Sequence, residues 1–209
     1  MARPGGTPIA LLCALPLERV ALAGMTGDGV LLARTGAGMA RGRAGAERAI
    51  SAGAGALVSV GFCGGADPDL SPGDVIVATE VVDAESGRTL GCDAGLCARV
   101  PGRRGALETR ARVARTPSER RASPSIAIDM ESAAIADAAV RADIPFAAVR
   151  AVSDAEHTRL PDAIDASGEL RLGAIRPGDL PDLARLGAGA ARAMLALRRA
   201  IRQLRAGAG

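Results

Sequence analysis

The chain has 209 residues, of which 48% are hydrophobic, and its net charge is only +3. This length and hydrophobic fraction suit one α/β domain with a sizeable core, and two independent domains would be cramped. The small charge and the near absence of aromatic residues, which are only Phe62 and Phe146, exclude a typical nucleic-acid-binding protein. The single histidine and the four cysteines show no zinc-binding spacing, so we expect no metal site.

The first part of the chain predicts strands that alternate with a helix. Apolar runs at residues 9–15, 30–34 and 56–60 predict buried strands, and small and apolar residues at helical spacing predict a helix over 42–52. The third strand is expected to end in a glycine-rich turn at 61–65. The apolar run at residues 9–17 lacks the basic start and cleavage site of a signal peptide and is followed at once by Glu18 and Arg19, so we expect a cytoplasmic protein.

The later part of the chain continues the alternation. Residues 74–78 predict a strand, 130–142 a helix, and 146–152 another strand. We therefore expect an α/β fold, a three-layer domain with a twisted, largely parallel central sheet flanked by helices. In such sheets ligands bind at the carboxyl ends of the strands, which is where candidate functional residues are sought.

Two segments stand apart from this pattern. Residues 83–125 are rich in Gly, Arg, Ser and Pro and predict irregular loop with a short helix, and no role follows from the arginine-rich stretch 102–121. Residues 180–205 predict an amphipathic C-terminal helix. That helix either packs on the sheet, which is the more ordinary arrangement, or makes a peripheral membrane contact through its basic face. With these segments included, we expect a single domain over residues 1–209.

Polar groups occur at four places where strands end or a helix begins. Residues 14–18, 61–65 and 150–154 follow apolar strands, and residues 128–132 open a helix. Each has an ordinary explanation by itself, since an acidic residue is favoured in the first turn of a helix and Asp154 could be a helix cap. The four together, at the expected ligand-binding edge of the sheet, predict a functional site.

Three of these motifs resemble those of the nucleoside phosphorylase and nucleosidase superfamily. Residues 60–78 resemble its glycine loop and following strand, 129–134 its ribose-binding motif, and 150–154 the segment that ends in its catalytic acid. The motifs are in the family's order, and the resemblance covers residues 9–160. It implies a nucleoside phosphorylase-like fold and cleavage of the bond between a purine base and its ribose, without a resident cofactor.

The resemblance also implies roles for individual residues. Asp154 would be the acid that protonates N7 of the purine, which makes the base a good leaving group, and Ser153 would position it. Glu131 would bind the ribose hydroxyls and stabilise positive charge as the sugar becomes oxocarbenium-like. Met130 would lie under the sugar as a polarizable surface.

The sequence leaves the nucleophile open between water and inorganic phosphate. Many phosphorylases carry an arginine where this chain has Ser59, and another where it has Glu18, which instead matches the water-activating glutamate of the nucleosidases. Because a carboxylate repels a phosphate dianion, Glu18 favours hydrolysis. Phosphorolysis with phosphate as co-substrate stays open through four other arginines: Arg19, Arg34, Arg41 and Arg43.

Within the superfamily the chain is similar to two branches. One is the methylthioadenosine/S-adenosylhomocysteine nucleosidases, and the other is the short bacterial phosphorylases associated with hopanoid biosynthesis. The tail patterns at residues 160–161, 168–173 and 177–181 resemble the second branch. The resemblance implies a 5′-substituted adenine nucleoside as substrate, adenosylhopane giving ribosylhopane in the second branch, and a homodimer or higher homo-oligomer.

The glycine loop and the segment expected to bind the base depart in part from the family pattern. The backbone at Cys63 and Gly64 would approach base and sugar as in the family, but Phe62 stands where nucleosidases usually carry a small polar residue. The stretch between residues 82 and 126 is short and has no aromatic residue to stack on a base. An alternative of another class is therefore a catalytically inactive nucleoside-binding protein.

Overall fold

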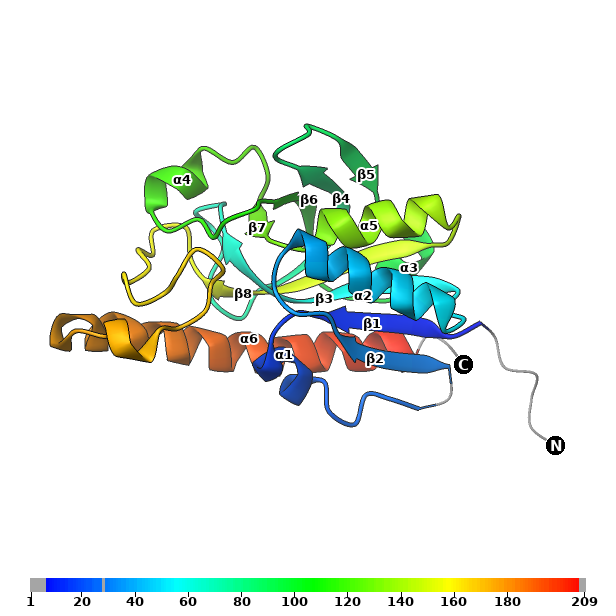
Figure 1. Cartoon of the computed structure of the whole chain (residues 1–209), viewed down its shortest axis with the longest axis horizontal. Helices are drawn as coiled ribbons and strands as arrows, with labels where there is room; N and C mark the ends of the chain where they lie inside the picture. Colours follow the sequence, from blue (N-terminus) through cyan, green and yellow to red (C-terminus); the bar gives the residue numbers. More distant parts are fainter. Residues whose placement is uncertain (1–6, 28, 207–209) are drawn as a thin grey trace.

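The computed structural model describes residues 7–27 and 29–206, which form a mixed sheet with helices on both faces (Figure 1). The strands are β1 (Ile9–Cys13), β2 (Val30–Arg34), β3 (Ala56–Gly65), β4 (Val75–Asp83), β5 (Thr89–Gly91), β6 (Arg103–Thr109), β7 (Ala127–Asp129) and β8 (Phe146–Asp154). The helices are α1 (Pro16–Ala21), α2 (Met39–Ser51), α3 (Ala94–Ala98), α4 (Pro117–Arg121), α5 (Ser132–Arg141) and α6 (Leu180–Ala206). Two short 3₁₀ turns precede α6: η1 (Leu172–Ala174) and η2 (Pro177–Asp179).

The sheet runs β2-β1-β3-β7-β6-β4-β5, and β8 pairs with both β3 and β4. Five of these eight pairings are parallel: β1 with β2 and β3, β3 with β8, and β6 with β4 and β7. The pairings of β3, β8, β4, β6 and β7 close into a ring, with β1 and β2 extending from β3. This arrangement confirms the expected α/β fold with a largely parallel central sheet. Residues 1–6, 28 and 207–209 of the expected domain lie outside the described residues.

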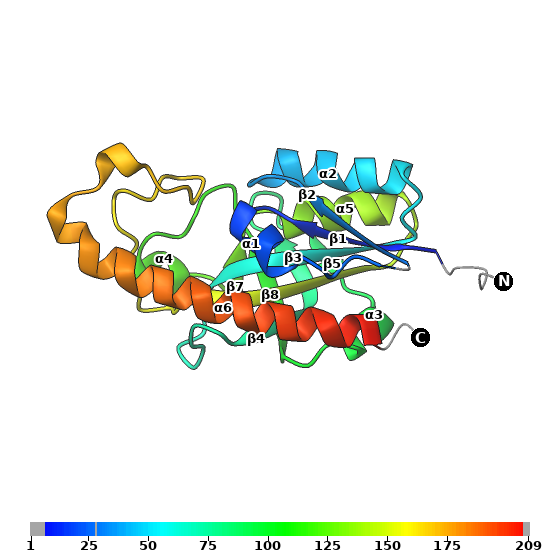
Figure 2. The ribbon, with the colours of Figure 1, turned by 90° about the horizontal axis from the view of Figure 1, so that it is seen from below.

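Helices cover the sheet from two sides, as Figure 2 shows, with α2 and α5 on one side and α6 on the other. The α6 residues that face the sheet are buried: Ala193, Leu197, Ile201 and Leu204. Because this apolar face packs in the core, the structure supports the packed-helix interpretation of the tail. Among the described residues, no helix has the length and apolar character that a membrane span requires.

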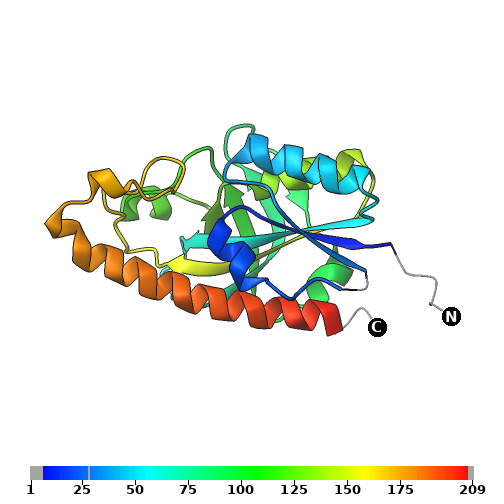
Figure 3. The same cartoon turned by 60° about the horizontal axis from the view of Figure 1, so that its bottom comes forward.

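The structure corrects two expectations. The glycine-rich segment 61–65 is not a turn, because β3 continues through Gly65 and pairs there with β7 and β8. Residues 83–125 are more regular than expected and contain β5, α3, β6 and α4. Pairing on both sides by β4 and β7 makes β6 a strand despite its polar sequence. Figure 3 shows α4 and the segment after β8 at the same end of the molecule.

Candidate active site

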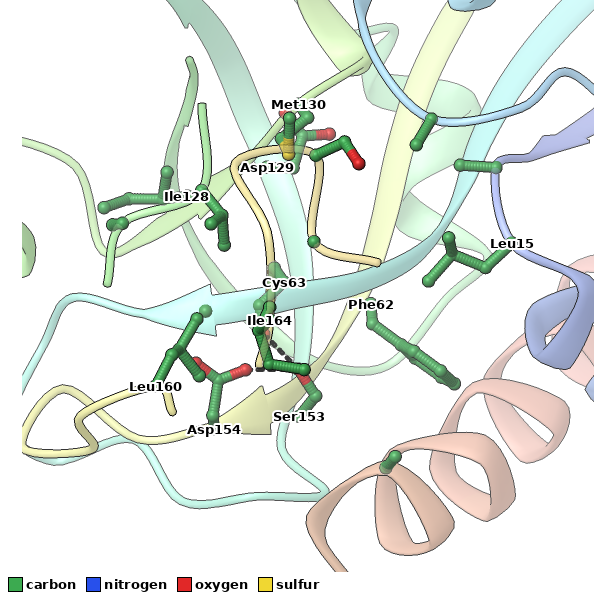
Figure 4. Close-up of a pocket in the computed structure, with 18 of the residues that line it drawn as sticks. Leu15, Phe62, Cys63, Ile128, Asp129, Met130, Ser153, Asp154, Leu160 and Ile164 are labelled. Carbon is green, nitrogen blue, oxygen red and sulfur yellow. Dashed lines mark hydrogen bonds between the residues drawn. The ribbon is translucent and has the colours of Figure 1, made fainter. Parts of the chain in front are cut away.

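Strands β1, β3, β7 and β8 end at a cavity of about 270 Å³ (Figure 4). The cavity therefore lies at the edge of the sheet where ligands bind in α/β folds. In the view of Figure 4, Ser153 and Asp154 lie on one side of it and Met130 lies on the other. All eight residues that the sequence singled out for the site line this cavity: Glu18, Phe62, Cys63, Gly64, Met130, Glu131, Ser153 and Asp154.

Glu18 is buried at the start of α1, directly after β1. Its Oε2 atom accepts hydrogen bonds from the backbone N–H groups of Ala14 and Leu15, both at 2.8 Å. Its Oε1 atom accepts a third from the backbone N–H of Phe62 at 2.7 Å. Three donors from two different segments hold the carboxylate in one position, so Glu18 is fixed at the border between α1 and the glycine-rich end of β3.

A buried arginine, Arg150 of β8, lies behind the cavity. Its Nη2 atom donates to the hydroxyl oxygens of Ser59 at 2.7 Å and Ser132 at 2.9 Å, and pairs with Asp129 Oδ2 at 2.5 Å. The Glu131 carboxylate lies 3.7 Å from the same nitrogen. Ser59, which replaces an arginine of many phosphorylases, therefore serves here as a partner of Arg150.

Glu131 stands at the N-terminal end of α5, next to Met130 at the cavity wall. Its Oε1 atom accepts a hydrogen bond from the backbone N–H of Gly38 at 2.8 Å, which ties α5 to the loop before α2. Asp129, one residue before Met130, accepts from the Thr109 hydroxyl at 2.6 Å. The backbone on both sides of Met130 is thus held by buried carboxylates.

The titratable groups at this end of the cavity are mostly acidic. Burial raises the pKa of Glu18 and raises that of Glu131 to about 7, and Arg150 opposes both shifts. Asp129 adds a third carboxyl group, so Arg150 is one guanidinium among three acidic side chains. Burial also raises the pKa of the Cys63 thiol, which keeps this cysteine neutral. Acidic side chains therefore outnumber basic ones at this end of the cavity.

At the other end of the cavity, Asp154 follows Ser153 at the end of β8. The Ser153 hydroxyl can donate its one proton either to Asp154 Oδ1 or to the carbonyl oxygen of Cys63, which is 3.2 Å away. Ser153 thus fixes the Asp154 carboxyl group against the end of β3.

Sequence reasoning missed Arg120, which lies in α4 within the arginine-rich stretch 102–121. Its side chain is buried, lines the cavity and forms an ion pair with Asp154 Oδ2. It is the single arginine of the cavity lining among the described residues. No local signal distinguished it from its arginine neighbours, because its partner lies 34 residues away.

The wall near Asp154 is apolar but not aromatic. Val113 and Ala114 come from the segment before α4, and Leu160 and Ile164 come from the segment after β8 (Figure 4). Backbone hydrogen bonds join the two segments: Leu160 N–H donates to the Arg115 carbonyl oxygen at 2.9 Å, and a second such bond joins residues 113 and 166 at 3.1 Å. Aliphatic side chains of these two segments thus form part of the cavity wall, and residues 82–126 supply no aromatic residue to it.

The four arginines that kept phosphate binding open do not line the cavity. Three of them, Arg19, Arg34 and Arg41, are exposed at their positions in α1, β2 and α2. Arg43 pairs with Asp137 at 3.0 Å on the outside of α2 and α5. Phosphate binding in this cavity would therefore need donors other than these four arginines.

A protein-family model matches most of this chain. The sequence model described as the phosphorylase superfamily matches residues 16–117 and 95–173, which together include each candidate residue named above. The chain belongs to the phosphorylase superfamily. None of the curated proteins compared with it matches.

Solved structures of a hydrolase and of nucleosidases share its fold. Futalosine hydrolase of Helicobacter pylori strain 26695 superposes with a TM-score of 0.77 at 13% identity, over 96% of this chain and 98% of the other. The 5′-methylthioadenosine/S-adenosylhomocysteine nucleosidase of the same organism gives 0.76 at 13% identity, over 97% and 99%. The S-adenosylhomocysteine nucleosidase of Streptococcus pyogenes, solved with 5-methylthiotubericidin, gives 0.70 at 22% identity, over 95% and 98%.

Proposed function

We propose that this protein hydrolyses the N-glycosidic bond of a 5′-substituted purine nucleoside. The observation that carries the proposal is Glu18, a carboxylate fixed by three backbone donors at the cavity position where a phosphorylase needs cationic groups. Glu131, Asp129 and Glu18 around Arg150 make that end of the cavity unfavourable for a phosphate dianion. Water, in contrast, needs a base and no charge compensation.

The reaction divides between the two ends of the cavity. Asp154 gives a proton to N7 of the base as the C1′–N9 bond breaks, and the electron pair of that bond leaves with the purine. The carboxylate of Glu131 stabilises the positive charge that develops on the ribose. Glu18 takes a proton from water, and the water oxygen bonds to C1′. The products are a free purine and a free 5′-substituted ribose.

The substrate's base and 5′ group are finer parts of the proposal. The sequence resemblance favours adenine, and the names of several structural neighbours contain adenosine compounds. Arg120, which pairs with Asp154, is the residue whose hydrogen bonding bears on the choice of base. A place in hopanoid biosynthesis is a second candidate that depends on the tail patterns 168–173 and 177–181, and the structural comparisons do not support it.

Base release tests the proposal directly. The protein should release purine from 5′-methylthioadenosine or 5′-methylthioinosine in phosphate-free buffer, followed by ultraviolet absorbance, and added phosphate should change the rate little. Absence of turnover on every purine nucleoside, with retained binding, would favour the inactive nucleoside-binding alternative. Assembly as a homodimer or higher homo-oligomer, proposed from the sequence resemblance, is tested by light scattering of the purified protein.

A further inference from the structure

Arg120 and Asp154 form one hydrogen-bonding surface at the end of the cavity. Arg120 Nη2 forms an ion pair with Asp154 Oδ2, and its Nη1 lies 3.4 Å from the Asp154 carbonyl oxygen. Gly64 makes room for this pair, since a Cβ atom there would lie under 3.0 Å from Arg120 Nη1. The side chains of Arg120 and Asp154 are only 1% and 12% exposed, so the pair is shielded from bulk water.

The guanidinium of Arg120 carries an N–H donor that is not used in a hydrogen bond within the described part of the chain. Its buried Nε atom has no hydrogen-bond partner in the described part of the chain. A buried unpaired donor is costly, so an acceptor placed against this guanidinium would be stabilised. A guanidinium carries donors and no acceptor, so the molecule that completes it must present an acceptor.

The proposed contact between Asp154 and N7 would place the Arg120–Asp154 pair along the edge of the purine that carries N7 and the substituent at position 6. If Asp154 serves N7, as the proposed function requires, its neighbour Arg120 faces the substituent at position 6 on the same edge. A 6-oxopurine presents two acceptors there, N7 and O6, whereas adenine presents the N7 acceptor and the donor N6–H₂. With N7 taken by Asp154, the O6 acceptor of a 6-oxopurine is left for a guanidinium N–H of Arg120, whereas adenine presents only a donor there.

The same ion pair works against adenine. A 6-amino group needs an acceptor, and the Asp154 Oδ2 atom that could supply it is occupied by Arg120. The amino group would face guanidinium N–H donors in a buried site, and Arg120 Nε would gain no acceptor from it. Sites that hydrogen-bond a particular substrate group reject the analogue that lacks it far more strongly than apolar pockets do.

We infer that Arg120 is a specificity-determining residue, and that the substrate's base is a 6-oxopurine of the hypoxanthine or guanine type. The inference deepens the proposed function and rests on it, because it places N7 at Asp154. It changes the base that the sequence resemblance favours and leaves the roles of Asp154, Glu131 and Glu18 as proposed.

The test compares two substrates that differ only at position 6, 5′-methylthioinosine and 5′-methylthioadenosine. The wild-type protein should favour the inosine compound in kcat/KM by about ten- to a hundredfold. Arg120→Met should lower that preference at least fivefold, whereas Arg120→Lys, which keeps a cationic donor, should keep most of it. Because Asp154 acts on both substrates alike, the ratio reports base selection and not acid strength.

Arg121→Met is the matched control. Arg121 belongs to the same helix and also forms a carboxylate ion pair, with Glu156, but it is largely exposed and does not line the cavity. This variant should keep the wild-type ratio. A wild-type preference for the adenosine compound, or an unchanged ratio in a folded Arg120→Met variant, would overturn the inference while leaving hydrolysis intact.

Calorimetry with the free bases separates the inference from the proposed function. Wild-type protein should bind hypoxanthine at least tenfold more tightly than adenine, whether or not it turns over a nucleoside and whether or not Arg120→Met folds. Equal affinities, or tighter binding of adenine, would overturn the role of Arg120. Absent turnover with a clear preference for hypoxanthine would contradict the proposed function alone.

Discussion

The Glu18 carboxylate accepts a hydrogen bond from the backbone N–H of Phe62 at 2.7 Å, although the two residues are 44 positions apart. This bond joins α1 to the glycine-rich end of β3. It places the carboxylate of Glu18, a potential general base, beside the backbone of Phe62 at the cavity. The position of Glu18 therefore depends on the geometry of β3 as well as on its own helix.

Gly61 is the point at which that geometry is most easily disturbed. A Cβ atom there would lie under 3.0 Å from both Arg150 Nη1 and Glu18 Oε1, and both side chains are buried. Gly61→Ala should lower the free energy of unfolding by about 1–3 kcal/mol and reduce turnover, because these groups cannot both give way. Gly91→Ala, which has open space around the added Cβ, should change stability by less than about 0.5 kcal/mol. Denaturant unfolding of both variants checks this, and equal stabilities would refute it.

Asp154→Asn should reduce purine release about 10²–10⁴-fold, because the base can no longer be protonated by this side chain. A nitrophenyl riboside has a leaving group that needs no proton, so its hydrolysis should be affected much less. Steady-state kinetics on both substrates measure the difference. If the purine nucleoside kept wild-type turnover, Asp154 would not be the acid.

Glu131→Gln should slow cleavage of a ribonucleoside more than cleavage of the matching 2′-deoxyribonucleoside. The reason is that the carboxylate is expected to bind the ribose hydroxyls as positive charge develops on the sugar. Comparing kcat and KM for the two substrates in both proteins measures the effect. Small and identical changes on both sugars would argue against contact with the ribose.

The raised pKa of Glu131 predicts how stability depends on pH. Burial raises this pKa from 4.5 to about 7, so the unfolded chain releases the proton at lower pH than the folded chain does. The free energy of unfolding should therefore fall as the pH rises from about 4.5 to about 7, by up to about 3 kcal/mol relative to Glu131→Gln. Urea unfolding of both proteins at several pH values measures this difference. A difference that stays constant with pH would contradict the assignment.

Much of the site could be predicted from the sequence because its motifs are local. Residues 61–65, 129–131 and 153–154 each follow or end a strand, and the fold rule that places strand ends at one edge brings them together. Glu18 could be predicted in the same way, because it follows strand β1 closely in the sequence. The helical spacing of apolar residues in the tail likewise predicted α6 and its buried face.

What could not be predicted depends on tertiary pairing. Strand β6 lacks an apolar pattern and forms because β4 and β7 pair with it on both sides. Arg120 is one of several arginines in its segment, and only the fold brings it to Asp154. Arg150 was part of a recognised motif, but its contacts with Asp129, Ser59 and Ser132 join four separate segments.

The identity of the sugar product tests the assignment of the nucleophile most directly. Turnover of a 5′-methylthio purine nucleoside in phosphate buffer made with ¹⁸O-labelled water should give a free sugar that carries the label, by mass spectrometry. The rate should be similar without phosphate, and Glu18→Ala should slow hydrolysis much more than it weakens substrate binding. A sugar 1-phosphate as the dominant product, with no turnover when phosphate is absent, would contradict hydrolysis and establish phosphorolysis in its place.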